Sequence, residues 1–244
     1  MGNYYVFNEK NKKKFINSKS WIKTALSGCN GKIIHGSGYV LFDDAVLWNK
    51  LYRMDFFRSL EIQIHGEMAT APDVPVVWCA FLSANKISVT DKTVINYRIG
   101  RRGQHTGAKD HRFFACFELF RYFFEFTENK SWAESMESYF LHLQLSRYLW
   151  GYEKTPSESR NEFFEKICSA FKQRHYTKKS KISYPPLKNK SLPEFIRILL
   201  LKILHPLALK AIVKQNKWQF DLVVFIRKIL ENCFLVLQFM KNVR

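Results

Sequence analysis

The chain has 244 residues, a length that suits one full domain or one and a half small ones. Hydrophobic residues make up 47% of it and charged residues 25%, with 10 Gly and 7 Pro, which excludes a disordered, collagen-like or low-complexity chain. The net charge of +18 favours an anionic partner: nucleic acid, a lipid surface or a phosphorylated ligand. A Lys-, Asn-, Phe- and Ile-rich bias of the source is the alternative, and it needs no partner.

The cysteine pattern predicts a reducing compartment. The five cysteines are widely spaced and form no CxxC pair, which argues against a zinc site or a disulfide framework. The N-terminal residues lack an apolar signal core, and no uncharged apolar run reaches about 18 residues. We therefore expect no membrane-spanning helix.

Residues 1 to about 107 mix short strands, loops and short helices. Alternating and β-branched runs predict strands at 2–7, 15–16, 61–64, 86–89 and 93–97. An amphipathic pattern predicts a short helix over 53–60. Asp73, followed by an apolar run through Leu82, is typical of a helix that begins with an acidic cap.

The rest of the chain is expected to be helical. Residues 108–176 predict three helices, over 111–127, over 131–150 and from 156 onward, and an aromatic stripe on the first points to a core. Residues 177–190 resemble a basic linker. Residues 191–244 predict two basic amphipathic helices, the first interrupted at His205-Pro206. From residue 178 on, the chain contains 14 Lys and Arg and 3 Asp and Glu, which gives a net charge of +11.

Five short segments carry the most specific signal of the sequence. In chain order they are Trp48-Asn49-Lys50-Leu51-Tyr52-Arg53, then Asp73 at a helix start, Ala84-Asn85-Lys86-Ile87, Ile95-Asn96-Tyr97-Arg98, and the loop Arg101-Arg102-Gly103-Gln104-His105-Thr106. This order resembles the C-terminal half of family 2 glycosyltransferases of the bacterial capsule and lipooligosaccharide type. The resemblance implies an α/β fold: an incomplete GT-A (Rossmann-like) half-domain over 1–107, followed by an α-helical C-terminal region.

The same family has motifs that this sequence lacks. Neither the nucleotide-binding DDxSxD segment nor the metal-binding DxD motif is present, and Asp43-Asp44 stands too close to Trp48 to replace them. The resemblance therefore implies an acceptor-side part without its donor-binding half. No cofactor is evident, and Mg²⁺ or Mn²⁺ is expected only with a complete donor half. The free histidines show no metal-ligand spacing, so we predict no metal site.

The resemblance also implies roles for individual residues. Asp73 corresponds to the general base that accepts the proton of the acceptor hydroxyl, although an N-cap role fits the same position. Arg98, Arg101, Arg102 and His105 correspond to a loop that could face the donor diphosphate, or that is simply solvated. Trp48, Lys50 and Tyr97 would belong to the donor or acceptor side, where Trp48 and Lys50 could serve packing alone.

The sequence therefore leaves three functions open. The first is transfer of a sugar from a nucleotide sugar to a glycan or lipid-linked acceptor in bacterial surface-polysaccharide synthesis. The second is an inactive remnant or accessory subunit, with a separate chain that supplies the donor half. The third, a basic nucleic-acid-binding protein, is disfavoured because no binding motif is present. Interleaved apolar and basic residues, as in Phe195–Leu204, predict a cytoplasmic protein held at the inner face of the membrane.

Overall fold

The computed structural model describes residues 3–8, 14–17, 41, 45–62, 73–88, 90, 92–99, 111–185 and 192–241. The chain divides into two compact units, Met1–Met136 and Glu137–Arg244. Each unit is treated separately below.

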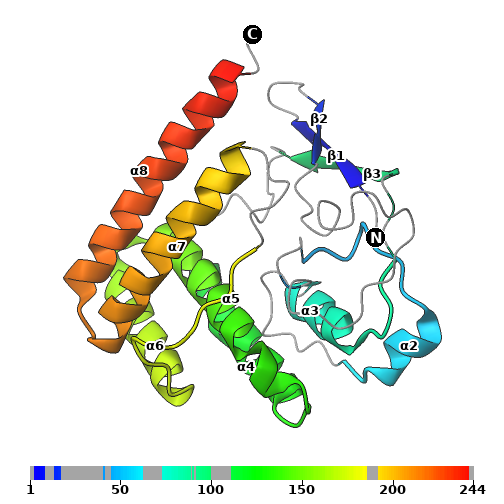
Figure 1. Ribbon diagram of the computed structural model, residues 1–244, viewed down its shortest axis with the longest axis horizontal. Helices are drawn as coiled ribbons and strands as arrows, with labels where there is room; N and C mark the ends of the chain where they lie inside the picture. Colours follow the sequence, from blue (N-terminus) through cyan, green and yellow to red (C-terminus); the bar gives the residue numbers. More distant parts are fainter. Residues whose placement is uncertain are drawn as a thin grey trace. The chain divides into compact units, whose positions relative to one another are not determined.

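The first unit contains a small sheet of three strands (Figure 1). Strand β1 (Asn3–Asn8) lies between β2 (Lys14–Asn17) and β3 (Thr93–Ile99), antiparallel to β2 and parallel to β3. These strands occupy the segments predicted at 2–7, 15–16 and 93–97. The predicted strand at 86–89 is wrong over its described residues, where Ile87 makes only an isolated bridge. Of the predicted strand at 61–64, residues 61 and 62 are not in a strand, and the other two lie outside the described residues.

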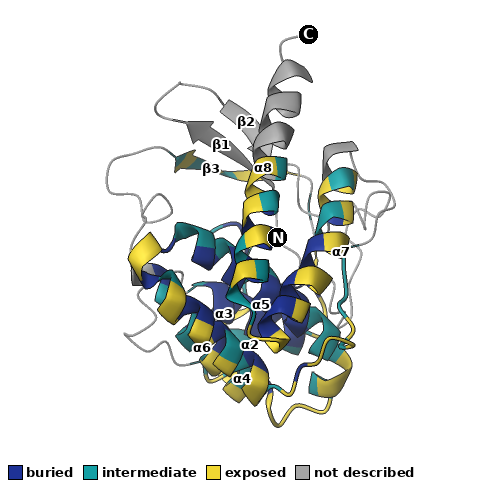
Figure 2. Cartoon of the chain, turned by 90° about the vertical axis from the view of Figure 1, so that its left-hand side faces the viewer, coloured by how far each residue is buried: buried dark blue, intermediate teal, exposed yellow. Residues whose placement is uncertain are grey.

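The helices of the first unit centre on α3 (Asp73–Ser83), which begins at the predicted Asp73. Residues Val74 to Leu82 of α3 are all buried, so this helix is surrounded on every side (Figure 2). Helix α4 (Ala115–Thr127) follows the 3₁₀ turn η3 (His111–Phe114) and packs on α3. The ring of Trp78 lies 5.6 Å from Phe120 and 5.2 Å from Phe123, between centroids. The short helix α2 (Met54–Ser59) lies within the segment predicted as helical.

The second unit is built from helices. Helix α5 begins at Ala133, just before the unit boundary, and ends at Lys154. It is followed by the 3₁₀ turn η4 (Ser157–Ser159), α6 (Arg160–Gln173), α7 (Leu192–Val213) and α8 (Lys217–Lys241). Residues 140–145 of α5 are all buried, so this stretch of the helix is covered on every side. Helices α7 and α8 form an antiparallel hairpin (Figure 1).

Aromatic rings join α5, α6 and α8. Tyr152 of α5 is fully buried, with its ring 6.1 Å from Phe163 and 5.1 Å from Phe220. Its hydroxyl donates a hydrogen bond to the carboxylate of Asp221, which also accepts one from the Lys217 ammonium at 2.7 Å. This pairing satisfies polar groups at the edge of an aromatic core.

Two predicted helix ends are wrong. Helix α5 does not stop at Gly151 but continues to Lys154, and the Thr155 hydroxyl donates to the Gly151 carbonyl at 2.9 Å. Thr155 therefore serves the end of α5. Helix α7 runs through Pro206, where a break was predicted. Pro206 itself is exposed, and the neighbouring His205, Ala208 and Leu209 are buried, so packing of the inner side of α7 offsets one lost backbone hydrogen bond.

The predicted fold class is also wrong. An incomplete α/β GT-A (Rossmann-like) half-domain was expected, but the described chain is mostly helical. The strands β1, β2 and β3 are 6, 4 and 7 residues long, whereas α5, α7 and α8 are each longer than 20 residues. The apolar residues recur mainly at helical spacing, and a helix of this length satisfies its own backbone without a sheet.

Within the described residues, no helix combines the length and the apolar character needed to cross a bilayer.

A pair of buried histidines lies inside the second unit. The rings of His142 in α5 and His205 in α7 are 4.9 Å apart, and the Tyr184 ring contacts both. Burial lowers the pKa of His142 to about 3, and Arg197 adds to the effect. Burial also lowers the pKa of His205, with His142 and Arg227 acting in the same direction. Both rings are therefore neutral in the folded protein at pH 7.

These histidines should make stability fall in acid. Between the usual pKa of 6.5 and about 3, the unfolded chain binds a proton at His142 that the folded chain does not. The free energy of unfolding should therefore decrease as the pH drops below 6.5, by about 1.4 kcal/mol per pH unit for each buried histidine. Urea unfolding from pH 7 to pH 4 measures this slope.

The matched variants are His142→Gln and His175→Gln, since His175 is exposed. The first should flatten the slope and the second should leave it unchanged. NMR titration of the wild-type histidine rings gives an independent reading. A His142 ring that becomes protonated near pH 6.5 in the folded protein would contradict the assignment.

Candidate functional site

The structure brings two of the motif segments together through stacked aromatic rings. The ring of Trp48 lies nearly parallel to that of Tyr97 in β3, with centroids 4.8 Å apart and 11° between the planes. Both side chains are half-buried. This offset stack joins the segment at 48–53 to the segment at 95–98, which are far apart in the sequence.

Lys50, two residues after Trp48, is buried, and its contacts include two hydrogen bonds and an aromatic ring. Its ammonium donates to the Val46 carbonyl at 2.8 Å and to Asn49 Oδ1 at 2.7 Å. The same ammonium lies 5.4 Å from the centre of the Phe81 ring in α3. Burial of a charged amine is costly unless hydrogen bonds and ring electrons replace water. Lys50 therefore ties the turn at 45–50 to α3, which agrees with the packing role considered for it.

Asp73 is the first residue of α3 and is half-buried. A carboxylate at this position faces the free N–H groups and the positive end of the helix dipole. The position therefore suits both an N-cap and an anionic proton acceptor. Because Phe81 lies eight residues further along the same helix, Asp73 and Lys50 are linked through one rigid element.

The described residues include only part of the predicted basic loop. Arg98 is exposed on β3, next to Tyr97. Arg101, Arg102 and His105 lie outside the described residues. Arg53, the last residue of the first motif segment, is exposed and pairs with Asp55 of α2. This ion pair raises the pKa of Arg53 and lowers that of Asp55.

Sequence reasoning missed two residues that shape the site. Asn49 is buried and accepts a hydrogen bond from Lys50, and Phe81 supplies the ring beside its ammonium. The signal for Asn49 was its place in a turn directly before a lysine, since asparagine side chains often bond to groups close by. No sequence signal marked Phe81 as part of the site, because an apolar residue within an apolar helix is expected to belong to the hydrophobic core.

The described residues offer few other reactive groups. No three His, Cys, Asp or Glu side chains among them come close enough to hold a metal ion. Burial raises the pKa of the Cys79 thiol strongly and that of Cys168 to about 11. Neither thiol is activated as a nucleophile at neutral pH. Asp73, at the first residue of α3, is the carboxylate of the predicted site that the structure describes.

Comparison of the chain with family models, with curated proteins and with solved structures finds no match in any of the three.

The hydrogen bonds of Lys50 predict a loss of stability when it is truncated. Lys50→Ala leaves Asn49 Oδ1 and the Val46 carbonyl without this donor and should lower the free energy of unfolding by about 1–3 kcal/mol. Lys86→Ala is the matched control, because Lys86 is exposed, and it should change stability by less than about 0.5 kcal/mol. Urea unfolding followed by tryptophan fluorescence compares them. Equal losses would show that Lys50 does not stabilise the site.

Proposed function

We propose that the chain takes part in transferring a sugar from a nucleotide sugar to a glycan or lipid-linked acceptor in bacterial surface-polysaccharide synthesis. The observation that carries this proposal is the stack of Trp48 on Tyr97, with Lys50 bound against α3. The segment at 48–53 thus contacts both the segment at 95–98 and helix α3, whose first residue is Asp73.

In the proposed reaction, the acceptor hydroxyl oxygen attacks the anomeric carbon of the donor sugar. The bond from that carbon to the diphosphate oxygen breaks, and the nucleoside diphosphate leaves with the electron pair. Asp73 accepts the proton of the attacking hydroxyl. Arg98, with Arg101, Arg102 and His105 after it in the sequence, would meet the negative charge of the leaving diphosphate.

The second candidate is an accessory subunit or an inactive remnant of the same origin. It is favoured by one observation, that the 244 residues contain neither a DDxSxD nor a DxD motif. In this case a separate chain supplies the donor site, and Mg²⁺ or Mn²⁺ belongs to that chain. The same cluster around α3 would then serve as an acceptor-side surface.

The proposal includes a location. A lipid-linked acceptor and a cytoplasmic donor would meet at the inner face of the cytoplasmic membrane, so we place the chain in the cytoplasm, peripheral to that membrane. The net charge of +11 after residue 177 supports this placement, because the cytoplasmic leaflet is anionic.

Replacement of Asp73 by asparagine tests the reaction. Asn caps a helix as well as Asp does, so Asp73→Asn should fold normally while it loses the proton acceptor. We expect turnover to fall by about 10²–10⁴-fold with donor binding unchanged. The assay supplies UDP-hexoses with bacterial lipid extracts as acceptors and measures release of UDP. Asp55→Asn is the control, since Asp55 lies on α2 and is exposed.

Each outcome favours one reading. Turnover that Asp73→Asn leaves at the full rate would overturn the assignment of the base. Absence of UDP-hexose binding at millimolar concentration would overturn transfer by this chain alone in favour of the accessory subunit.

A further inference from the structure

Helix α8 presents a continuous stripe of large apolar side chains to solvent. Trp218, Leu222, Phe225 and Ile229 are spaced four, three and four residues apart, and thus share one face of the helix. Their exposed fractions are 71%, 41%, 60% and 45%. The opposite face holds the buried residues Phe220, Val223, Val224 and Arg227. One side of α8 therefore packs against the core, whereas the apolar residues on its other side are exposed.

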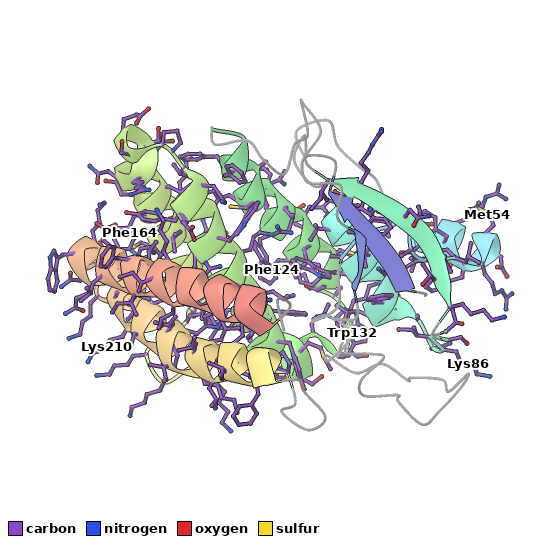
Figure 3. The ribbon with its side chains drawn as sticks, turned by 90° about the horizontal axis from the view of Figure 1, so that it is seen from above. Met54, Lys86, Phe124, Trp132, Phe164 and Lys210 are labelled. Carbon is purple, nitrogen blue, oxygen red and sulfur yellow. The ribbon has the colours of Figure 1, made fainter. Side chains whose placement is uncertain are left out.

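Helix α7 repeats this arrangement. Phe195, Leu199, Ile203 and Leu207 recur every four residues and are all exposed, Ile203 by 60%. Its buried side includes Leu204, Ala208 and Ile212. Because α7 and α8 pack as a hairpin, both exposed stripes belong to one supersecondary element (Figure 2, Figure 3). We call the eight residues of the two stripes, with the basic side chains among them, the α7–α8 face.

Positive charges outnumber negative ones on this hairpin: residues 192–241 contain eight Lys and Arg and three Asp and Glu. Its exposed basic residues are Arg197, Lys202, Lys210, Lys214 and Lys228. Figure 3 shows Lys210 projecting from α7 on the side away from α8. Among the side chains described in these two helices, Asp221 is the one acidic group, and it is bound by Lys217 and Tyr152. The α7–α8 face thus combines apolar stripes with a net positive charge.

We propose that the α7–α8 face binds the surface of an anionic lipid bilayer, with the two helices lying along that surface. The apolar stripes would enter the boundary between headgroups and acyl chains, where tryptophan is favoured. The lysines would reach lipid phosphates with their flexible stems. A second copy of the same face fits less well, because it would bring like charges together. This inference rests on the proposed location but not on sugar transfer.

Sedimentation of the full chain with lipid vesicles tests the proposal. Vesicles of phosphatidylcholine with phosphatidylglycerol supply the anionic surface, and phosphatidylcholine alone supplies the neutral one. We expect the wild type to sediment with anionic vesicles and to bind neutral vesicles at least about tenfold more weakly. Binding should weaken as salt increases.

Substitutions on the apolar stripe locate the contact. The triple variant Trp218→Ser, Phe225→Ser, Ile229→Ser removes exposed side chains and should leave the core intact. It should reduce partitioning to anionic vesicles by about tenfold or more. The matched control replaces the exposed apolar residues Leu51, Met54 and Val94 by serine, and should partition as the wild type does.

Charge reversals test the electrostatic part. Lys202→Glu, Lys210→Glu and Lys214→Glu together should lower partitioning by about tenfold or more. The same three reversals at Lys178, Lys179 and Lys181, which are exposed before α7, make the control with an identical change in net charge. If both triple variants lose binding equally, net charge and not this face directs the chain to lipid, and the proposal fails.

Two further results would overturn the inference. One is failure of the wild type to bind anionic vesicles. The other is a wild-type dimer in lipid-free sedimentation that the serine variant of α8 converts to a monomer, since a second copy would then occupy the face. The sugar-transfer proposal is judged separately, from UDP-hexose binding without lipid. If the chain binds vesicles but not UDP-hexose, only the sugar-transfer proposal is rejected. If it binds UDP-hexose but not vesicles, only the membrane proposal is rejected.

Discussion

Complete burial of α3 is the constraint on which the candidate site depends. A helix that is apolar on every side is stable only when other elements surround it, and α4 supplies one wall through Phe120 and Phe123 around Trp78. The turn at 45–50 supplies another, where Lys50 reaches Phe81. Because α3 is fixed in this way, its first residue, Asp73, is held on the same helix as Phe81, the residue that Lys50 contacts. Packing in the core therefore sets the geometry available for chemistry.

In the second unit, core packing also fixes the orientation of a helix, and there it leaves an apolar side of α8 exposed. Tyr152 gathers Phe163 and Phe220 around it and binds Asp221, which fixes the inner face of α8. Once Phe220 points inward, helical geometry directs Trp218 and Phe225 outward. The exposed apolar stripe is thus a direct consequence of how α8 is anchored. An exposed apolar stripe of this kind is a common sign of a binding surface.

The sequence predicted local structure better than architecture. The start of α3 at Asp73 was predicted correctly, because an acidic residue before an apolar run is a local signal. The break at Pro206 and the stop at Gly151 were wrong, because burial of neighbours such as His205 and Tyr152 outweighs local propensity. The α/β fold class was wrong for a related reason. It rested on a resemblance and on short strand patterns, and in the part of the chain that the structure describes those patterns form three short strands beside long helices.

The sequence by itself determined the charge of the chain, the helical periodicity of its second half and the residue types of the candidate site. Each of these is a property of composition or of neighbours within a few positions. Only the tertiary structure decided that Trp48 stacks on Tyr97, that Lys50 is bound against Phe81, and that one side of α8 stays uncovered. Such contacts join residues far apart along the chain. They are selected by the burial of whole faces, a condition that no single segment contains.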